Sequence, residues 1–175
     1  YYHASYLGKP HDYLWLASTP PALMYEELKK AYDATADRIW LLNAGDIKSC
    51  EFPLTLFLEM AYDIDAFSYD NIADFAAKGL ADIFGGDYYD RFHRITNEYF
   101  RLAFARKPEF MGFGYEWNTN RHGRERVVDT DFSIHNYGEF QRRWADYERI
   151  GAETEEILEQ LPQDQRSACY QLLYY

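Results

Sequence analysis

The 175-residue sequence has only two cysteines, Cys50 and Cys169, and they lie far apart. Such a pair provides neither a disulfide framework nor the ligand spacing of a zinc site. No apolar run approaches the roughly 20 residues that a membrane-spanning helix needs. Basic residues are few: 18 against 29 acidic ones leave a net charge of −11, which disfavours binding to nucleic acid. The sequence therefore predicts no membrane span, no nucleic-acid partner, no metal and no cofactor.

Apolar and aromatic residues, by contrast, are abundant. They make up 47% and 19% of the chain, enough to build a substantial core at this length. Both chain ends are also apolar, starting with Tyr1 and finishing with Tyr175, whereas the ends of a domain are usually polar and frayed. We therefore expect the chain to be an internal segment of a longer protein, in which a signal peptide could not be seen.

The first part of the chain, residues 1–65, alternates strand and helix signals. Strands are predicted at 1–5 and 39–42. One helix is predicted after Thr19, which would cap it, and another over about 53–60. The run Ile-Trp-Leu-Leu at 39–42 is typical of a strand buried on both faces. This βαβα order indicates a parallel sheet, and its remaining strands must come from upstream of residue 1.

The second part, residues 66–175, shows helical periodicity and no convincing strand. Apolar residues recur every three or four positions over 72–84, 88–102 and 137–161, and a further helix is expected from about 164. These segments predict an antiparallel helical bundle that continues past residue 175. The stretch 107–133 is longer than an ordinary connection within a bundle.

A polar cluster follows the apolar run at 39–42. It consists of Asn43, Asp46, Lys48 and Glu51, with Gly45 allowing a sharp turn. In parallel α/β folds, functional side chains project from the carboxyl ends of strands, and a carboxylate beside an ammonium suits a polyhydroxylated or anionic ligand. The alternative is that Asp46 or Glu51 only caps the next helix.

A second cluster, His3, Ser5 and Tyr6, lies at the end of the first strand. His3 could donate a hydrogen bond to a ligand oxygen, titrate near neutral pH, or sit in the core with its bonds satisfied. No Gly-x-Ser-x-Gly elbow and no histidine pair with metal-ligand spacing accompanies it. The aromatic run at 110–117 could stack on sugars or could fix a long loop to the bundle.

Four stretches together resemble the xylan α-1,2-glucuronidases of glycoside hydrolase family 115. They are YYHASYLGKPHDYLWL at 1–16, NAGDIK at 43–48, KPEFMG at 107–112 and YQL at 170–172, in the order found in that family. The resemblance covers nearly the whole chain, and its first segment is specific. The sequence departs from the family pattern at Ser49 and Cys50, where Pro often follows the lysine, and this puts Glu51 in doubt as a site residue.

The resemblance implies a large multidomain enzyme with a (β/α)8 barrel followed by a helical domain. Residues 1–65 would be the last two βα units of the barrel, and residues 66–175 would be the helical bundle, truncated at its C-terminus. The family removes glucuronic acid or its 4-O-methyl form from xylan with inversion, which needs an acid and a base about 6.5–9.5 Å apart. The main catalytic carboxylates would lie upstream, so the isolated chain is expected to be inactive.

The resemblance assigns substrate binding to His3, Tyr6, Asn43, Asp46 and Lys48, and charge makes Lys48 a sensible partner for the uronate carboxylate. The implied partners are glucuronoxylan or its oligosaccharides and the upstream half of the barrel, with a homodimer as a further arrangement. The implied location is secreted or periplasmic. The competing hypothesis is a non-catalytic helical module for structure or interaction, since a fold does not by itself imply a function.

Overall fold

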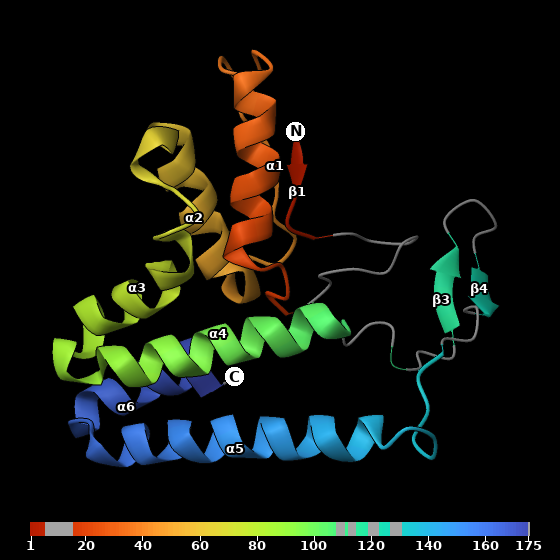
Figure 1. The fold of residues 1–175 in the computed structure, drawn as a ribbon, viewed down its shortest axis with the longest axis vertical. Coiled ribbons are helices and arrows are strands. Elements are labelled where there is room, and N and C mark those ends of the chain that lie inside the picture. Colours follow the sequence, from red (N-terminus) through yellow and green to blue (C-terminus); the bar gives the residue numbers. More distant parts are fainter. Residues whose placement is uncertain (6–15, 108–110, 112–114, 119–122, 127–130, 175) are drawn as a thin grey trace. The chain divides into compact units, whose positions relative to one another are not determined.

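The computed structural model describes residues 1–5, 16–107, 111, 115–118, 123–126 and 131–174 (Figure 1). The chain forms two compact units. Unit 1 comprises Tyr1–Ile72 with Ala103–Phe132, and unit 2 comprises Ala73–Leu102 with Ser133–Tyr175. The domain boundary predicted between residues 65 and 66 stays a prediction.

Unit 1 contains a small parallel sheet with helices that follow each strand. Strand β1 (Tyr2–His3) pairs with β2 (Leu42–Asn43), and helix α1 (Pro21–Asp33) lies between them in the sequence. After β2 come a 3-10 turn (Lys48–Cys50), helix α2 (Glu51–Tyr62) and a second 3-10 turn (Ile64–Ala66). The predicted βαβα order and the parallel pairing are both confirmed for this segment.

Helix α2 covers one face of the β1–β2 sheet. The ring of Tyr2 stacks on that of Phe57 with centroids 6.5 Å apart, and the Trp40 ring lies 5.6 Å from the same phenylalanine. Leu56, Phe57 and Met60 of α2 are all buried. Because side chains alternate along an extended chain, Tyr2 and Trp40 point to the covered face and their neighbours point to the other.

The predicted strand at 39–42 is wrong in extent, and one face of this segment is exposed in the chain. Only Leu42 and Asn43 form β2, and Ile39 and Leu41 are 85% and 60% exposed. Among the described residues, β2 pairs with β1 alone and no second layer covers the face opposite α2. A continuous apolar run indicates burial only when both neighbouring layers are present.

Thr19 does not cap the first helix, contrary to expectation. Pro20 occupies the N-cap position of α1 and Pro21 its first turn, where proline is well tolerated. The hydroxyl groups of Ser18 and Thr19 are buried, and within the described part of the chain they have no hydrogen-bond partner.

The expectation that no strand follows residue 66 is also wrong. Strands β3 (Tyr115–Asn118) and β4 (Gly123–Arg126) form an antiparallel hairpin in unit 1. Its two strands are only four residues each, too short for the periodicity of a strand to stand out in the sequence.

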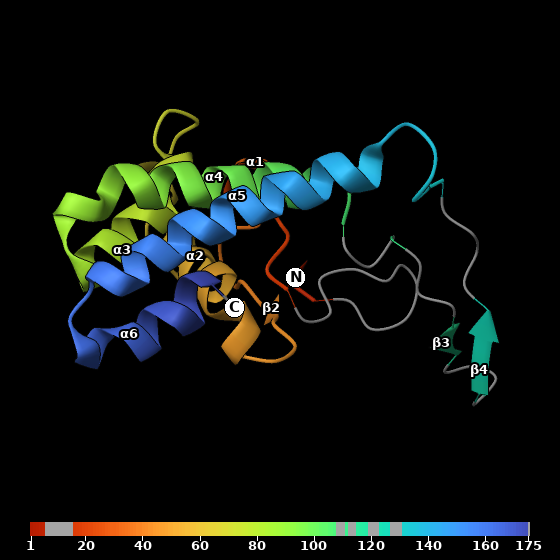
Figure 2. The ribbon, with the colours of Figure 1, turned by 90° about the horizontal axis from the view of Figure 1, so that it is seen from below.

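Unit 2 is helical. It contains α3 (Phe75–Phe84) after the 3-10 turn Ile72–Asp74, the turn Gly86–Tyr88, most of α4 (Tyr89–Ala105), α5 (Glu139–Gln160), α6 (Gln163–Cys169) and a final π-helical turn (Tyr170–Tyr174). Helices α4 (green) and α5 (light blue) lie side by side and antiparallel in both views (Figures 1 and 2). The predicted helices at 72–84, 88–102 and 137–161 are confirmed within a few residues.

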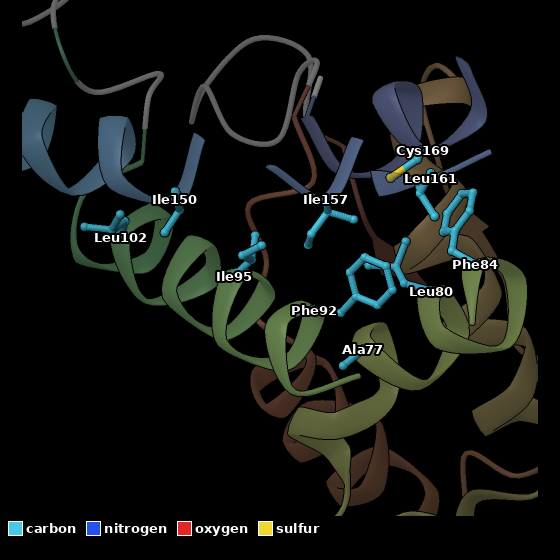
Figure 3. Close-up of a cluster of buried hydrophobic side chains, with 10 residues drawn as sticks. All are labelled: Ala77, Leu80, Phe84, Phe92, Ile95, Leu102, Ile150, Ile157, Leu161 and Cys169. Atoms are coloured by element: carbon cyan, nitrogen blue, oxygen red, sulfur yellow. The ribbon is translucent and has the colours of Figure 1, made fainter. Parts of the chain in front are cut away.

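One apolar cluster joins the helices of unit 2 (Figure 3). Phe92 of α4, Ile157 of α5 and Cys169 of α6 are all completely buried in it. Burial raises the pKa of the Cys169 thiol to about 11, so this cysteine stays neutral and behaves as a small apolar side chain. The cluster members are Ala77, Leu80, Phe84, Phe92, Ile95, Leu102, Ile150, Ile157, Leu161 and Cys169.

Charged side chains link α4 to α5 outside this core. Glu98 accepts two hydrogen bonds from Arg101, at 2.7 and 2.9 Å, and one from Arg149 at 2.9 Å. The Arg101 and Arg149 guanidinium groups hold the pKa of Glu98 down to about 2. A second contact joins Arg91 and Arg94 of α4 to Glu153 of α5. Charged contacts therefore join the two antiparallel helices at two places along their length.

The depressed pKa of Glu98 predicts a pH-dependent stability. The carboxylate is favoured in the folded state, so its stabilisation is complete above about pH 4.5 and is lost as the pH falls toward 2. Such a network is worth about 1 kcal/mol, and Glu98→Gln should lower the melting temperature at pH 7 by about 2–4 °C. Circular dichroism of the 175-residue chain should show this difference shrinking by pH 3. Glu148→Gln, at an exposed position of α5, is the control and should show no such trend; a Glu98→Gln difference independent of pH would contradict the assignment.

Candidate functional site

The register of the β1–β2 pair places two predicted site residues directly opposite each other. His3 aligns with Asn43, and backbone bonds fix the alignment from both sides: Tyr2 N–H donates to Leu41 O at 2.9 Å and Ala4 N–H to Asn43 O at 2.8 Å. Both residues stand at the carboxyl ends of parallel strands, where α/β folds bind their ligands.

Side-chain bonds join the same two residues. Asn43 Nδ2 lies 2.9 Å from His3 Nδ1 and donates to the backbone carbonyl of Ser5 at 3.1 Å. The Tyr1 ring meets the His3 ring edge-on, with centroids 4.6 Å apart. His3 is therefore held by its neighbours, and in this chain both His3 and Asn43 are partly exposed.

Gly45 allows the turn after β2 to pack against the end of β1. Its φ of +63° is in the left-handed region, and a Cβ atom at this position would lie 2.6 Å from Ser5 Oγ and 2.8 Å from Ser5 Cβ. A side chain would fit there only if Ser5 moved. The contact keeps Ser5 buried and the polar segment after β2 close to the end of β1.

Asp46 and Lys48 are exposed in the turn between β2 and α2. Lys48 Nζ lies 3.1 Å from Glu51 Oε1, so the lysine points along the first turn of α2. The helix itself begins at Glu51 with Cys50 in the N-cap position, where its side chain makes no capping hydrogen bond. Glu51 thus partners Lys48, which accounts for it without a direct role at the site.

The structure does not describe every predicted residue. Tyr6 lies outside the described residues, as do residues 110 and 112–114 of the aromatic run. Among the residues described, no group of three or more His, Cys, Asp or Glu side chains is arranged to hold a metal ion. No helix within the described ranges is long and apolar enough to span a bilayer.

A cavity of about 390 Å³ opens near the other end of β2. Residues that precede the strand, Asp37, Arg38 and Trp40, line it together with the C-terminal turn of α2 from Met60 to Tyr62. None of the predicted site residues contributes to this cavity. The strand-end cluster has better-defined chemistry, because its polar groups are fixed by hydrogen bonds across two strands.

The family model of glycosyl hydrolase family 115 matches residues 1–110, which include every predicted site residue. The chain belongs to glycosyl hydrolase family 115. It is similar to a solved structure described as a family GH115 4-O-methyl-α-glucuronidase, BtGH115A, with specificity for decorated arabinogalactans. The identity is 33% and the TM-score 0.82, over 98% of this chain but only 22% of that one. Among curated proteins, none matches the chain.

Membership of family 115 supports the family resemblance of the sequence motifs. Sequence reasoning placed Ser5 in the cluster but missed the role of its carbonyl, which accepts from Asn43, and it missed Tyr1, which packs against His3. The alternation of side chains in a strand places Tyr1 and His3 on one face, so that contact could have been foreseen. The backbone bond of Ser5 depends on a contact 38 residues away and had no local signal.

The Gly45 contact predicts a large local effect of Gly45→Ala. A left-handed alanine costs about 1–2 kcal/mol, and the overlap with Ser5 adds to it. In the protein that contains this chain, hydrogen exchange of the peptides covering residues 1–5 and 41–48 should become at least about tenfold faster.

Gly79→Ala is the matched control. Gly79 lies in α3 with open space around it, so alanine should slightly slow exchange in that helix. Unchanged exchange around residues 41–48 in Gly45→Ala would show that the turn accommodates a side chain.

Proposed function

We propose that this chain contributes substrate-binding residues to an enzyme that removes glucuronic acid, or its 4-O-methyl form, from polysaccharide side chains. The proposal rests on family membership together with the hydrogen-bonded pair of His3 and Asn43 at the strand ends. In this proposal the β1–β2 sheet is part of a (β/α)8 barrel whose other strands come from elsewhere in the polypeptide.

The two-faced sheet supports the barrel proposal. Helix α2 covers the face of Tyr2, as the outer helices of a barrel do, while Tyr1 and Leu41 on the other face are 74% and 60% exposed. A barrel would bury that second face in its interior. His3 and Asn43 would then form the interior layer nearest the carboxyl ends of the strands, where barrel enzymes bind their substrates.

Asp46 and Lys48 would extend the site from the turn after β2. A lysine ammonium can bind the carboxylate that distinguishes a uronic acid from a neutral sugar. Lys48 is exposed and paired only with the nearby Glu51 in the contacts described, so a ligand carboxylate could compete for it at small cost. Tyr6, next to Ser5 in the sequence, is proposed as a further contact.

Two polysaccharides are candidates for the substrate. The sequence motifs resemble those of xylan glucuronidases, which favours glucuronoxylan. The structural neighbour's stated specificity for decorated arabinogalactans favours arabinogalactan bearing glucuronic acid. Incubating the protein that contains this chain with each polysaccharide, and measuring released uronic acid by chromatography, separates the two. Release from neither would favour a non-catalytic helical module.

Asp46→Asn and Lys48→Ala should each lower kcat/KM on the preferred polysaccharide by at least about tenfold, or ~1.4 kcal/mol of transition-state stabilisation. The reason is the position of both residues after β2, on the turn that Gly45 packs against Ser5. Lys30→Ala is a suitable control, because this exposed α1 lysine pairs only with Glu26 and Glu27 in the contacts described. Near-normal kinetics in both test variants would reduce the pair to a structural role in the turn.

The inverting mechanism requires an acid, a base and a water molecule between them. We place the two carboxylates upstream of Tyr1, and the isolated 175-residue chain should therefore release no uronic acid even when soluble. Its exposed Ile39 and Leu41 should also favour aggregation. The test is to express residues 1–175 and 66–175 separately and to measure uronic acid release and thermal unfolding. Turnover by the longer piece would contradict upstream catalysis, and a cooperative transition in the shorter one would support the boundary at residue 65.

A further inference from the structure

The hydrogen bonds around Asn43 determine which nitrogen of the His3 ring carries the proton. Asn43 Nδ2 lies 3.1 Å from the carbonyl oxygen of Ser5, and a carbonyl oxygen can only accept. The side-chain atom facing Ser5 must therefore be the amide nitrogen, since the amide oxygen would repel the carbonyl.

The same amide nitrogen lies 2.9 Å from His3 Nδ1. It has two hydrogens: one goes to Ser5 O, and the other points at Nδ1. Nδ1 must then be the unprotonated, accepting nitrogen, so the neutral ring carries its proton on Nε2.

The groups that set this arrangement are themselves fixed. Ala4 N–H donates to Asn43 O at 2.8 Å, and Ser5 is buried beneath the turn at Gly45. The Tyr1 ring packs against the His3 ring in a T-shaped arrangement. A half-turn of the imidazole would replace Nδ1 with a carbon atom and lose its hydrogen bond to Asn43.

We propose that Asn43 is a positioning residue that fixes the tautomer of His3, so that His3 meets the ligand as an N–H donor through Nε2. This rests on the proposed function above and deepens it. A neutral donor of this kind suits an acceptor oxygen of the sugar, either a hydroxyl or the uronate carboxylate, and it does not act as a proton-abstracting base. Asn43 therefore acts through His3, with both of its amide hydrogens engaged by the protein.

The first test reads the tautomer without any activity assay. The complete protein is labelled with ¹⁵N-histidine, and the His3 ring signals are assigned by their loss in His3→Gln. We expect an unprotonated Nδ1 and a protonated Nε2. The reverse pattern would overturn the proposal, and this measurement needs no variant at Asn43.

The second test is a double-mutant cycle in the same protein. Gln places an N–H donor about where Nε2 lies and does not depend on Asn43 for its tautomer. Asn43→Ala should therefore lower kcat/KM at least about tenfold with His3 present, but less than about twofold in the His3→Gln background. Equal losses in both backgrounds would overturn the positioning role and make Asn43 a direct ligand contact.

The two tests also separate this proposal from the proposed function. A protein that releases no uronic acid from any substrate but shows the Nε2–H ring would refute the function and leave the tautomer assignment standing. An active enzyme whose His3 carries its proton on Nδ1 would support the proposed function and refute the tautomer assignment.

Discussion

Parallel pairing of two very short strands is the interaction on which the candidate site depends. Two backbone hydrogen bonds align β1 with β2, and the residues they bring together lie 40 positions apart in the chain. Without this alignment, His3 and Asn43 would be unrelated side chains on separate segments. A shift of one residue in register would also turn Asn43 to the face that α2 covers, because side chains alternate along a strand.

The two faces of the β1–β2 sheet differ in character: one packs on α2, and the other carries the candidate site residues. Its covered face consists of aromatic and aliphatic side chains that pack on α2, and its other face carries the polar pair at one end and apolar side chains toward the other. Helices that cover only one face of a sheet produce such a division. Unit 2 is organised differently, with an apolar cluster inside and arginine–glutamate contacts along α4 and α5.

The sequence predicted most of the fold because the signals were local. Helical periodicity and the βαβα order depend on neighbouring residues, and both are confirmed within a few positions. The errors arose where burial depends on distant partners: Ile39 and Leu41 have an apolar pattern but no covering layer in the described part of the chain. Thr19 is a residue type that often caps helices, yet Pro20 occupies the N-cap position of α1. At the site, residue type and strand position identified His3 and Asn43, whereas their mutual hydrogen bond required the register.

The bond between Asn43 and His3 also has a consequence for how this family can diverge. The two side chains are chemically matched, one donating and one accepting, and they belong to consecutive βα units. An aspartate at position 43 would place carboxylate oxygens against the Ser5 carbonyl oxygen and the lone pair of His3 Nδ1. It would therefore be tolerated only if the histidine also changed. Positions 3 and 43 should thus be inherited as a pair, although each unit could otherwise accumulate substitutions independently.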